Sequence, residues 1–154
     1  EIAENENGIA TVMAHEMGHV IGKHSNERMS QALLLDVATS VAQTATGTTL
    51  QGGAKTAYNL LRAYGIFLPF GRKQEAESDY LGLIFMTIAG YDPNETVKLW
   101  ERMRDYTKKK GGAPPEFMST HPSSENRIEN FRKWIPEVKE KYFAHHHNYF
   151  FKKN

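Results

Sequence analysis

His15, Glu16 and His19 are the residues whose types and spacing point most directly to chemistry. Positions i and i+4 differ by only about 40° around an α-helix, so both imidazoles can reach one metal ion. Glu16 lies about 100° from His15 around the helix axis, where its carboxylate can approach a metal-bound water without displacing it. The sequence His-Glu-Met-Gly-His therefore indicates half of a zinc site that carries its own general base.

A catalytic zinc takes three protein ligands and keeps a fourth position open for water, and the sequence offers two sources for the third ligand. The first is a histidine three residues after Gly22, as in metzincins. Here the histidine is His24, one residue early, and Ser25 occupies the expected position. This near miss counts against the metzincin class.

The second source is an acidic pair on a later helix, Glu75 and Asp79. These residues share one helical face, whereas Glu77 lies about 200° away from Glu75. Glu75 would bind the metal. Asp79 would accept the second N–H of a zinc-bound imidazole, with His15 the best candidate, and so fix the tautomer of that ring. The alternative interpretation is a solvated acidic face of an ordinary helix.

Three separated motifs together resemble peptidase family M48, and in particular its soluble BepA-like branch. They are HEMGH at 15–19, the stretch 68–83 around the acidic pair, and Ser-Thr-His-Pro at 119–122 with Arg127 and Ile128 after it. The resemblance implies a gluzincin-type zinc endopeptidase that binds one Zn²⁺ per chain. By this likeness the zinc ligands are His15, His19 and Glu75, and the catalytic base is Glu16.

His121 has two opposite roles under this resemblance. Prolines on both sides of it predict a loop. The histidine would either donate to the transition-state oxyanion or enter the site and close the open zinc position. The plain alternative is a loop histidine that bonds to the backbone. Arg127 would position the loop by pairing with a carboxylate, or it is a simple surface arginine.

Composition is typical of one small globular domain. The 154 residues are 40% hydrophobic, and 19 basic against 18 acidic side chains give a net charge of +1, which implies no strong attraction to nucleic acid or to an anionic membrane. The lack of cysteine excludes disulfides and thiolate zinc ligands. We expect a zinc metallopeptidase catalytic domain over residues 1–142 and a flexible tail over 143–154, which contains His145, His146 and His147.

Hydrophobic periodicity predicts a mainly α fold, and the family resemblance implies a zincin-like helical core. The apolar stretch 64–70 is interpreted as ordinary core, with a lid or substrate-facing wall as the alternative. The chain begins almost at the zinc helix and without Met, which predicts a piece of a longer protein that lacks the family's N-terminal substrate-binding sheet. Helices are predicted at about 5–24, 26–44, 54–65, 72–89, 93–109 and 123–142.

Two functions compete on these residues. The first is hydrolysis of protein or peptide substrates by a zinc-activated water, in the envelope protein quality control that the resemblance implies for an extracytoplasmic, cell-envelope or periplasmic protein. The second is a latent, zinc-stabilised helical module with a chaperone-like or regulatory role, in which His121 is a structural fourth ligand. A metal-free helical interaction domain would require the motif match to be accidental. The number of protein ligands separates the first two, because structural zinc sites are closed.

Overall fold

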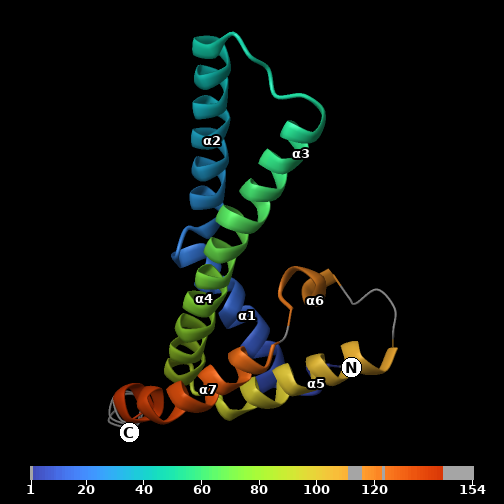
Figure 1. Cartoon of the computed structure of the whole chain (residues 1–154). Coiled ribbons are helices and arrows are strands. Elements are labelled where there is room, and N and C mark those ends of the chain that lie inside the picture. Colours follow the sequence, from blue (N-terminus) through green and yellow to red (C-terminus); the bar gives the residue numbers. More distant parts are fainter. Residues whose placement is uncertain (1, 111–115, 123, 144–154) are drawn as a thin grey trace, which may run out of the picture. The chain divides into compact units, whose positions relative to one another are not determined.

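The computed structural model describes residues 2–110, 116–122 and 124–143, and every regular element among them is helical (Figure 1). The mainly α class is therefore confirmed. The histidines of the predicted tail lie outside the described residues. The elements are α1 (Glu6–Ile21), α2 (His24–Thr46), α3 (Gly52–Leu60), η1 (Leu61–Phe67), α4 (Leu68–Ile88), α5 (Asn94–Lys110), α6 (Glu116–Thr120), α7 (Glu125–Val138) and η2 (Lys139–Phe143).

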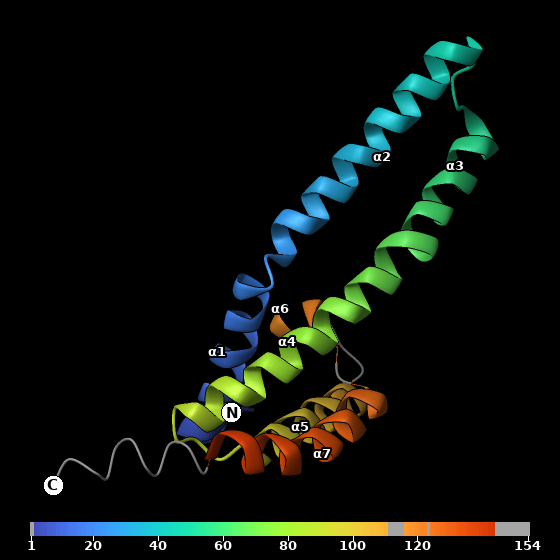
Figure 2. The ribbon, with the colours of Figure 1, turned by 90° about the vertical axis from the view of Figure 1, so that its left-hand side faces the viewer.

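The chain divides into two compact units, a core unit of residues 1–18 with 76–154 and a hairpin unit of residues 19–75. In the core unit, α5 and α7 lie side by side (Figures 1 and 2). Trp100 is buried between them, and the centroid of its ring lies 6.0 Å from that of the stacked ring of Phe131. The buried apolar cluster of this unit consists of Leu83, Leu99, Trp100, Met103, Ile128, Phe131, Ile135 and Val138.

Two glycines allow a close approach between α1 and α4 in the core unit. A Cβ atom on Gly18 would lie 2.8 Å from the Cα and carbonyl oxygen of Ser78, and one on Gly82 would lie 3.2 Å from the backbone nitrogen of His15. Contacts this short leave no room for a side chain, so the two helices meet backbone to backbone. This packing brings Asp79, one residue after Ser78, to the side of His15.

The hairpin unit contains α2 and α3, which lie side by side and are joined by residues 47–51 (Figures 1 and 2). Gly47 adopts a left-handed conformation with φ of 64° and ends α2, as glycine commonly does at helix C-termini. The hydroxyl groups of Thr39 and Tyr58 form a hydrogen bond between the two helices. The connection is thus shorter than the gap between the predicted helices 26–44 and 54–65.

The predicted helix break near Phe70 is wrong, because α3, η1 and α4 follow one another without a gap. Pro69 lacks an N–H group, and in a regular α-helix its ring would clash with the carbonyl four residues earlier. The π-helix η1 relieves this conflict because its backbone hydrogen bonds reach back five residues instead of four. The N–H of Leu68, for example, donates to the carbonyl of Ala63. The core interpretation of 64–70 is also wrong, because Tyr64 is 67% exposed.

None of the helices in the described ranges combines the length and the apolar character required to cross a membrane.

Candidate metal centre

Helix α1 presents His15 and His19 one turn apart, and each imidazole has its own partners. His15 belongs to the core unit and is only 3% exposed. Its Nδ1 lies 3.0 Å from a carboxylate oxygen of Asp79, and its Nε2 lies 3.2 Å from Nδ1 of His121. One ring nitrogen is therefore held by a carboxylate, while the other faces a second imidazole.

Arg127 holds Asp79 in this position. Its Nε and Nη2 atoms donate to the two carboxylate oxygens of Asp79 at 2.8 and 2.6 Å, and Nη1 donates to the carbonyl of Pro122 at 3.2 Å. The guanidinium also lies 3.7 Å from the ring centroid of Trp100. Arg127, whose side chain is 11% exposed, is thus a largely buried bidentate partner rather than a surface arginine. It ties Pro122, the residue after His121, to the carboxylate that contacts His15.

A short helix that the sequence did not predict presents His121. Helix α6 ends at Thr120, and the N–H of His121 donates to the carbonyl of Phe117 at 2.9 Å. The ring centroids of Phe117 and His121 lie 5.0 Å apart. The Nε2 atom of His121 is 3.3 Å from a carboxylate oxygen of Glu16, whose side chain is half exposed. The imidazole of His121 therefore lies between His15 and the predicted base.

In the hairpin unit, His19 contacts Glu75 and His24. Its Nε2 lies 3.2 Å from a carboxylate oxygen of Glu75, and its Nδ1 lies 2.9 Å from Nδ1 of His24. His24 is 1% exposed and is the one described residue of α2 that is buried. It contacts His19 in place of joining the candidate ligands, because Lys23 adopts a left-handed conformation with φ of 54° and separates α1 from α2.

Sequence reasoning did not assign this supporting position to His24. The near miss of the metzincin spacing was a usable signal that an imidazole lies close to the motif. A helix break at Lys23, which redirects the side chain of His24, is not visible in the spacing.

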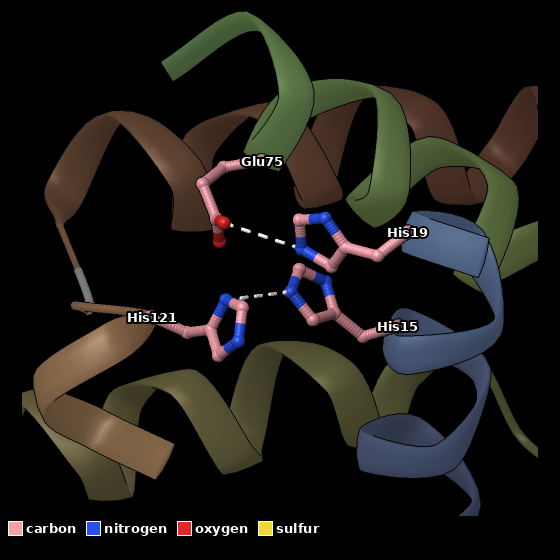
Figure 3. Close-up of side chains that lie close together, drawn as sticks. All are labelled: His15, His19, Glu75 and His121. Carbon is pink, nitrogen blue, oxygen red and sulfur yellow. Dashed lines mark hydrogen bonds and ion pairs between the residues drawn. The ribbon is translucent and has the colours of Figure 1, made fainter. Parts of the chain in front are cut away.

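Four side chains offer metal-binding atoms that all lie within 4.8 Å of one another, and Figure 3 shows them converging. Four ligands about 2.0–2.1 Å from a tetrahedral zinc would lie about 3.3 Å from each other. The distance from His15 Nε2 to His121 Nδ1 is 3.2 Å, and so is the distance from His19 Nε2 to a carboxylate oxygen of Glu75. Both agree with this ligand-to-ligand separation. Nitrogen and carboxylate oxygen are ligands that zinc accepts, so the donor set fits this metal. The four residues are His15, His19, Glu75 and His121.

A His-Glu-x-x-His helix combined with a distant glutamate is the donor arrangement of a zincin-like metallopeptidase of the gluzincin type. Residues 1–135 match the profile of Peptidase family M48. Because this match covers most of the chain, the chain belongs to that family, and the resemblance noted in its motifs is confirmed. A metal, typically zinc, is implied by the family, in agreement with the His/Glu cluster.

Several curated proteins are similar over most of the chain. The mitochondrial metalloendopeptidase OMA1 of Saccharomyces cerevisiae is 40% identical over 144 residues, which are 92% of this chain and 40% of the relative. The OMA1 protein of Schizosaccharomyces pombe is 39% identical, over 91% of this chain and 40% of its own length. The beta-barrel assembly-enhancing protease of Yersinia pestis is 26% identical, over 97% of this chain and 32% of its own length. The chain thus spans about two fifths of the length of the two fungal OMA1 relatives. No solved structure matches.

Proposed function

We propose that residues 1–142 are the catalytic domain of a zinc-dependent endopeptidase that hydrolyses proteins or peptides. The observation that carries the proposal is the convergence of three imidazoles and one carboxylate, with the glutamate of the helical motif beside them. One zinc per chain would be held by His15, His19 and Glu75. When bound, it would polarise the scissile carbonyl and lower the pKa of a water molecule towards about 7.

Glu16 is the proposed general base. Its carboxylate is exposed and belongs to the same helical turn as His15 and His19, so the attacking water can reach it. It accepts the proton as the water attacks the carbonyl carbon, and it delivers the proton to the leaving amine. The proximity of His121, at 3.3 Å, supports a role for that imidazole in the same space.

Asp79 and Arg127 are proposed to position His15. A carboxylate on the second nitrogen of a zinc-bound histidine fixes its tautomer and raises its basicity. The bidentate contact with Arg127 leaves Asp79 little freedom to rotate. Because Arg127 also binds the carbonyl of Pro122, it would keep the His121 loop in register with this histidine.

The test of the base is Glu16→Gln in the full-length parent protein, assayed with casein or a quenched-fluorescence peptide. The amide keeps the shape but cannot accept the proton, so turnover should fall below detection while zinc content is unchanged. Glu6→Gln, on the same helix and also exposed, is the matched control and should behave as the unmodified protein. Turnover of the Glu16→Gln variant within a few-fold of the unmodified protein would remove Glu16 from the mechanism.

The test of the ligand set is elemental analysis of two variants of α4. Glu75→Ala should lower zinc content well below one ion per chain, whereas Glu77→Ala, two residues away on another face, should leave it unchanged. Equal, stoichiometric zinc in both variants would show that Glu75 is not the third ligand.

The rival function, a latent zinc-stabilised module, has a specific observation in its favour. His121 completes a set of four candidate ligands, and four protein ligands are typical of a closed structural site. We propose that this set is the resting state of the peptidase, from which the loop of His121 withdraws when substrate binds. His121→Ala in the parent should then raise turnover. A loss of roughly 10²-fold in kcat would assign the histidine to the oxyanion instead, and inactivity of every form would favour the module.

The names of the two fungal OMA1 relatives, which are 40% and 39% identical to this chain, support a mitochondrial location of the parent protein. The motifs alone favoured the cell envelope or periplasm. Immunodetection in fractionated cells tests the proposal, and a signal confined to another compartment would contradict it.

A further inference from the structure

A buried amide joins α4 to the first turn of α2 within the hairpin unit. It belongs to Gln74, which directly precedes the candidate ligand Glu75 and is only 2% exposed. Its Oε1 accepts a hydrogen bond from Nε of Arg28 at 2.7 Å. Its Nε2 donates to a carboxylate oxygen of Glu27 at 2.6 Å and, over a longer 3.5 Å, to the backbone carbonyl of His24. Both ends of the amide are therefore bonded to α2.

Burial of the Gln74 amide is expensive in free energy unless it is hydrogen-bonded, and its bonds do little more than offset that cost. An apolar side chain of similar volume, such as Met, would fill the same space without losing hydration. The amide adds geometry instead, because directional bonds to several partners fix both its own position and the approach of α4 to α2.

The contacts of Gln74 complete a closed loop around His19. The residue that receives the Gln74 bond on its backbone, His24, also places its ring nitrogen 2.9 Å from Nδ1 of His19. On the other side, Nε2 of His19 lies 3.2 Å from the carboxylate of Glu75, as Figure 3 shows. Gln74 thus holds both neighbours of this imidazole, one through its amide and one through the backbone of α4.

We propose that Gln74 is a positioning residue of the metal centre, which sets the separation of His19 and Glu75 before the ion binds. The inference rests on the proposed function, because it takes these two residues as zinc ligands. Gln74 itself does not touch the metal. Ligands that are already held in place lose less conformational freedom on binding, and residues behind the ligands commonly tune metal affinity for this reason. The plain alternative is a tie that only stabilises the hairpin.

The experiment compares Gln74→Met with the unmodified 154-residue chain. Competition with a fluorescent zinc chelator should show affinity about tenfold weaker, with the stoichiometry still one. At saturating Co²⁺, a spectroscopic substitute for zinc, the visible absorption bands should shift because the ligand geometry has changed. The free energy of unfolding should change little, because Glu27 and Arg28 are exposed and can bond to water instead.

The matched control is Arg62→Gln. Arg62 also joins α2 to the helical run that follows it, but its 2.6 Å ion pair ends on Asp36 rather than on a neighbour of His19. This variant should keep the zinc affinity and the Co²⁺ spectrum of the unmodified chain. Circular dichroism and urea unfolding show whether each variant remains folded.

An exchange of roles between Gln74 and Glu27 gives a second, independent test. Gln74→Glu alone sets two carboxylates against each other and should weaken zinc binding. A purely electrostatic effect would have the opposite sign, because added negative charge favours a cation. Combining it with Glu27→Gln restores a donor opposite an acceptor, with Arg28 still beside the oxygen of residue 74, and should recover most of the affinity.

The possible failures of the two proposals differ. Unchanged affinity and spectrum in Gln74→Met, beside a Glu75→Ala variant that loses the ion, would overturn the positioning role and leave the ligand set intact. Equal losses in Gln74→Met and Arg62→Gln, or no recovery in the double variant, would also overturn it. Stoichiometric zinc in Glu75→Ala would instead contradict the proposed function.

Discussion

Helices α7 and α2 both repeat apolar residues at helical spacing, but they use these residues in opposite ways. In α7, Ile128 and Phe131 are at most 1% exposed and form part of the core. In α2, Leu34 and Val41 are more than 60% exposed. The spacing of apolar residues therefore identifies the apolar face of a helix but does not show whether another element covers that face. Burial within this chain therefore stabilises α7, whereas the exposed apolar side chains of α2 contribute little in this way.

The largest expected effect follows directly from this contrast. Phe131→Ala removes a fully buried ring that stacks on Trp100, so it should lower the free energy of unfolding by about 4 kcal/mol. Leu34→Ala on α2 should change it by less than about 0.5 kcal/mol, because the side chain is exposed. Urea denaturation followed by circular dichroism measures both. Similar losses in the two variants would show that α2 is covered in solution.

Ion pairs sharpen the same comparison. Arg127→Gln leaves the carboxylate of Asp79 buried without its bidentate partner, which should cost about 3 kcal/mol of unfolding free energy. Asp36→Asn breaks the pair with Arg62 in the hairpin unit, but Asp36 is 61% exposed, so the cost should stay near about 0.5 kcal/mol. A difference below 1 kcal/mol between the two variants would mean that the Asp79 pair is hydrated.

His24 is the exception within α2, since it is buried and contacts His19. If it orients a zinc ligand, His24→Ala should weaken zinc affinity about 10-fold to 100-fold while leaving the stoichiometry at one. Competition with a fluorescent zinc chelator measures the affinity. Leu34→Ala, exposed on the same helix, is the control, and equal affinities in the two variants would assign His24 to packing alone.

The smallest effect concerns Glu95, at the start of α5. Burial acts to raise the pKa of this carboxyl, but its hydrogen bond and charge interaction with Arg102, together with Lys98, outweigh burial and hold the pKa below the ordinary 4.5. Its stabilisation is therefore complete above pH 4.5 and is lost as the pH falls through the lowered value.

Glu95→Gln tests this contribution. The variant should be about 1 kcal/mol less stable than the unmodified chain at pH 7, and the difference should shrink as the medium becomes more acidic than pH 4.5. Unfolding curves at a series of pH values give the comparison. A difference that grows on acidification would reverse the sign of the proposed pKa shift.

The sequence by itself determined the family and the helical class of this chain. Local spacing carries this information: His19 follows His15 by four positions, and Asp79 follows Glu75 by four, so each pair defines one face of a single helix wherever that helix lies. The His-Glu-x-x-His motif also predicts the metal from ligand chemistry alone. The assignment of individual ligands remains a prediction that the geometry supports.

Tertiary structure decided which of these faces meet. The role of Gly18 and Gly82 follows only from the structure, where a Cβ atom on either residue would collide with the backbone of the neighbouring helix. The close packing of α1 on α4 makes His15 the partner of Asp79. The bidentate contact of Arg127 spans 48 residues in sequence, so no local pattern predicts it. Exposure likewise depends on what packs against a helix, and for that reason the stretch around Tyr64 was assigned to the core from its hydrophobicity but is found at the surface.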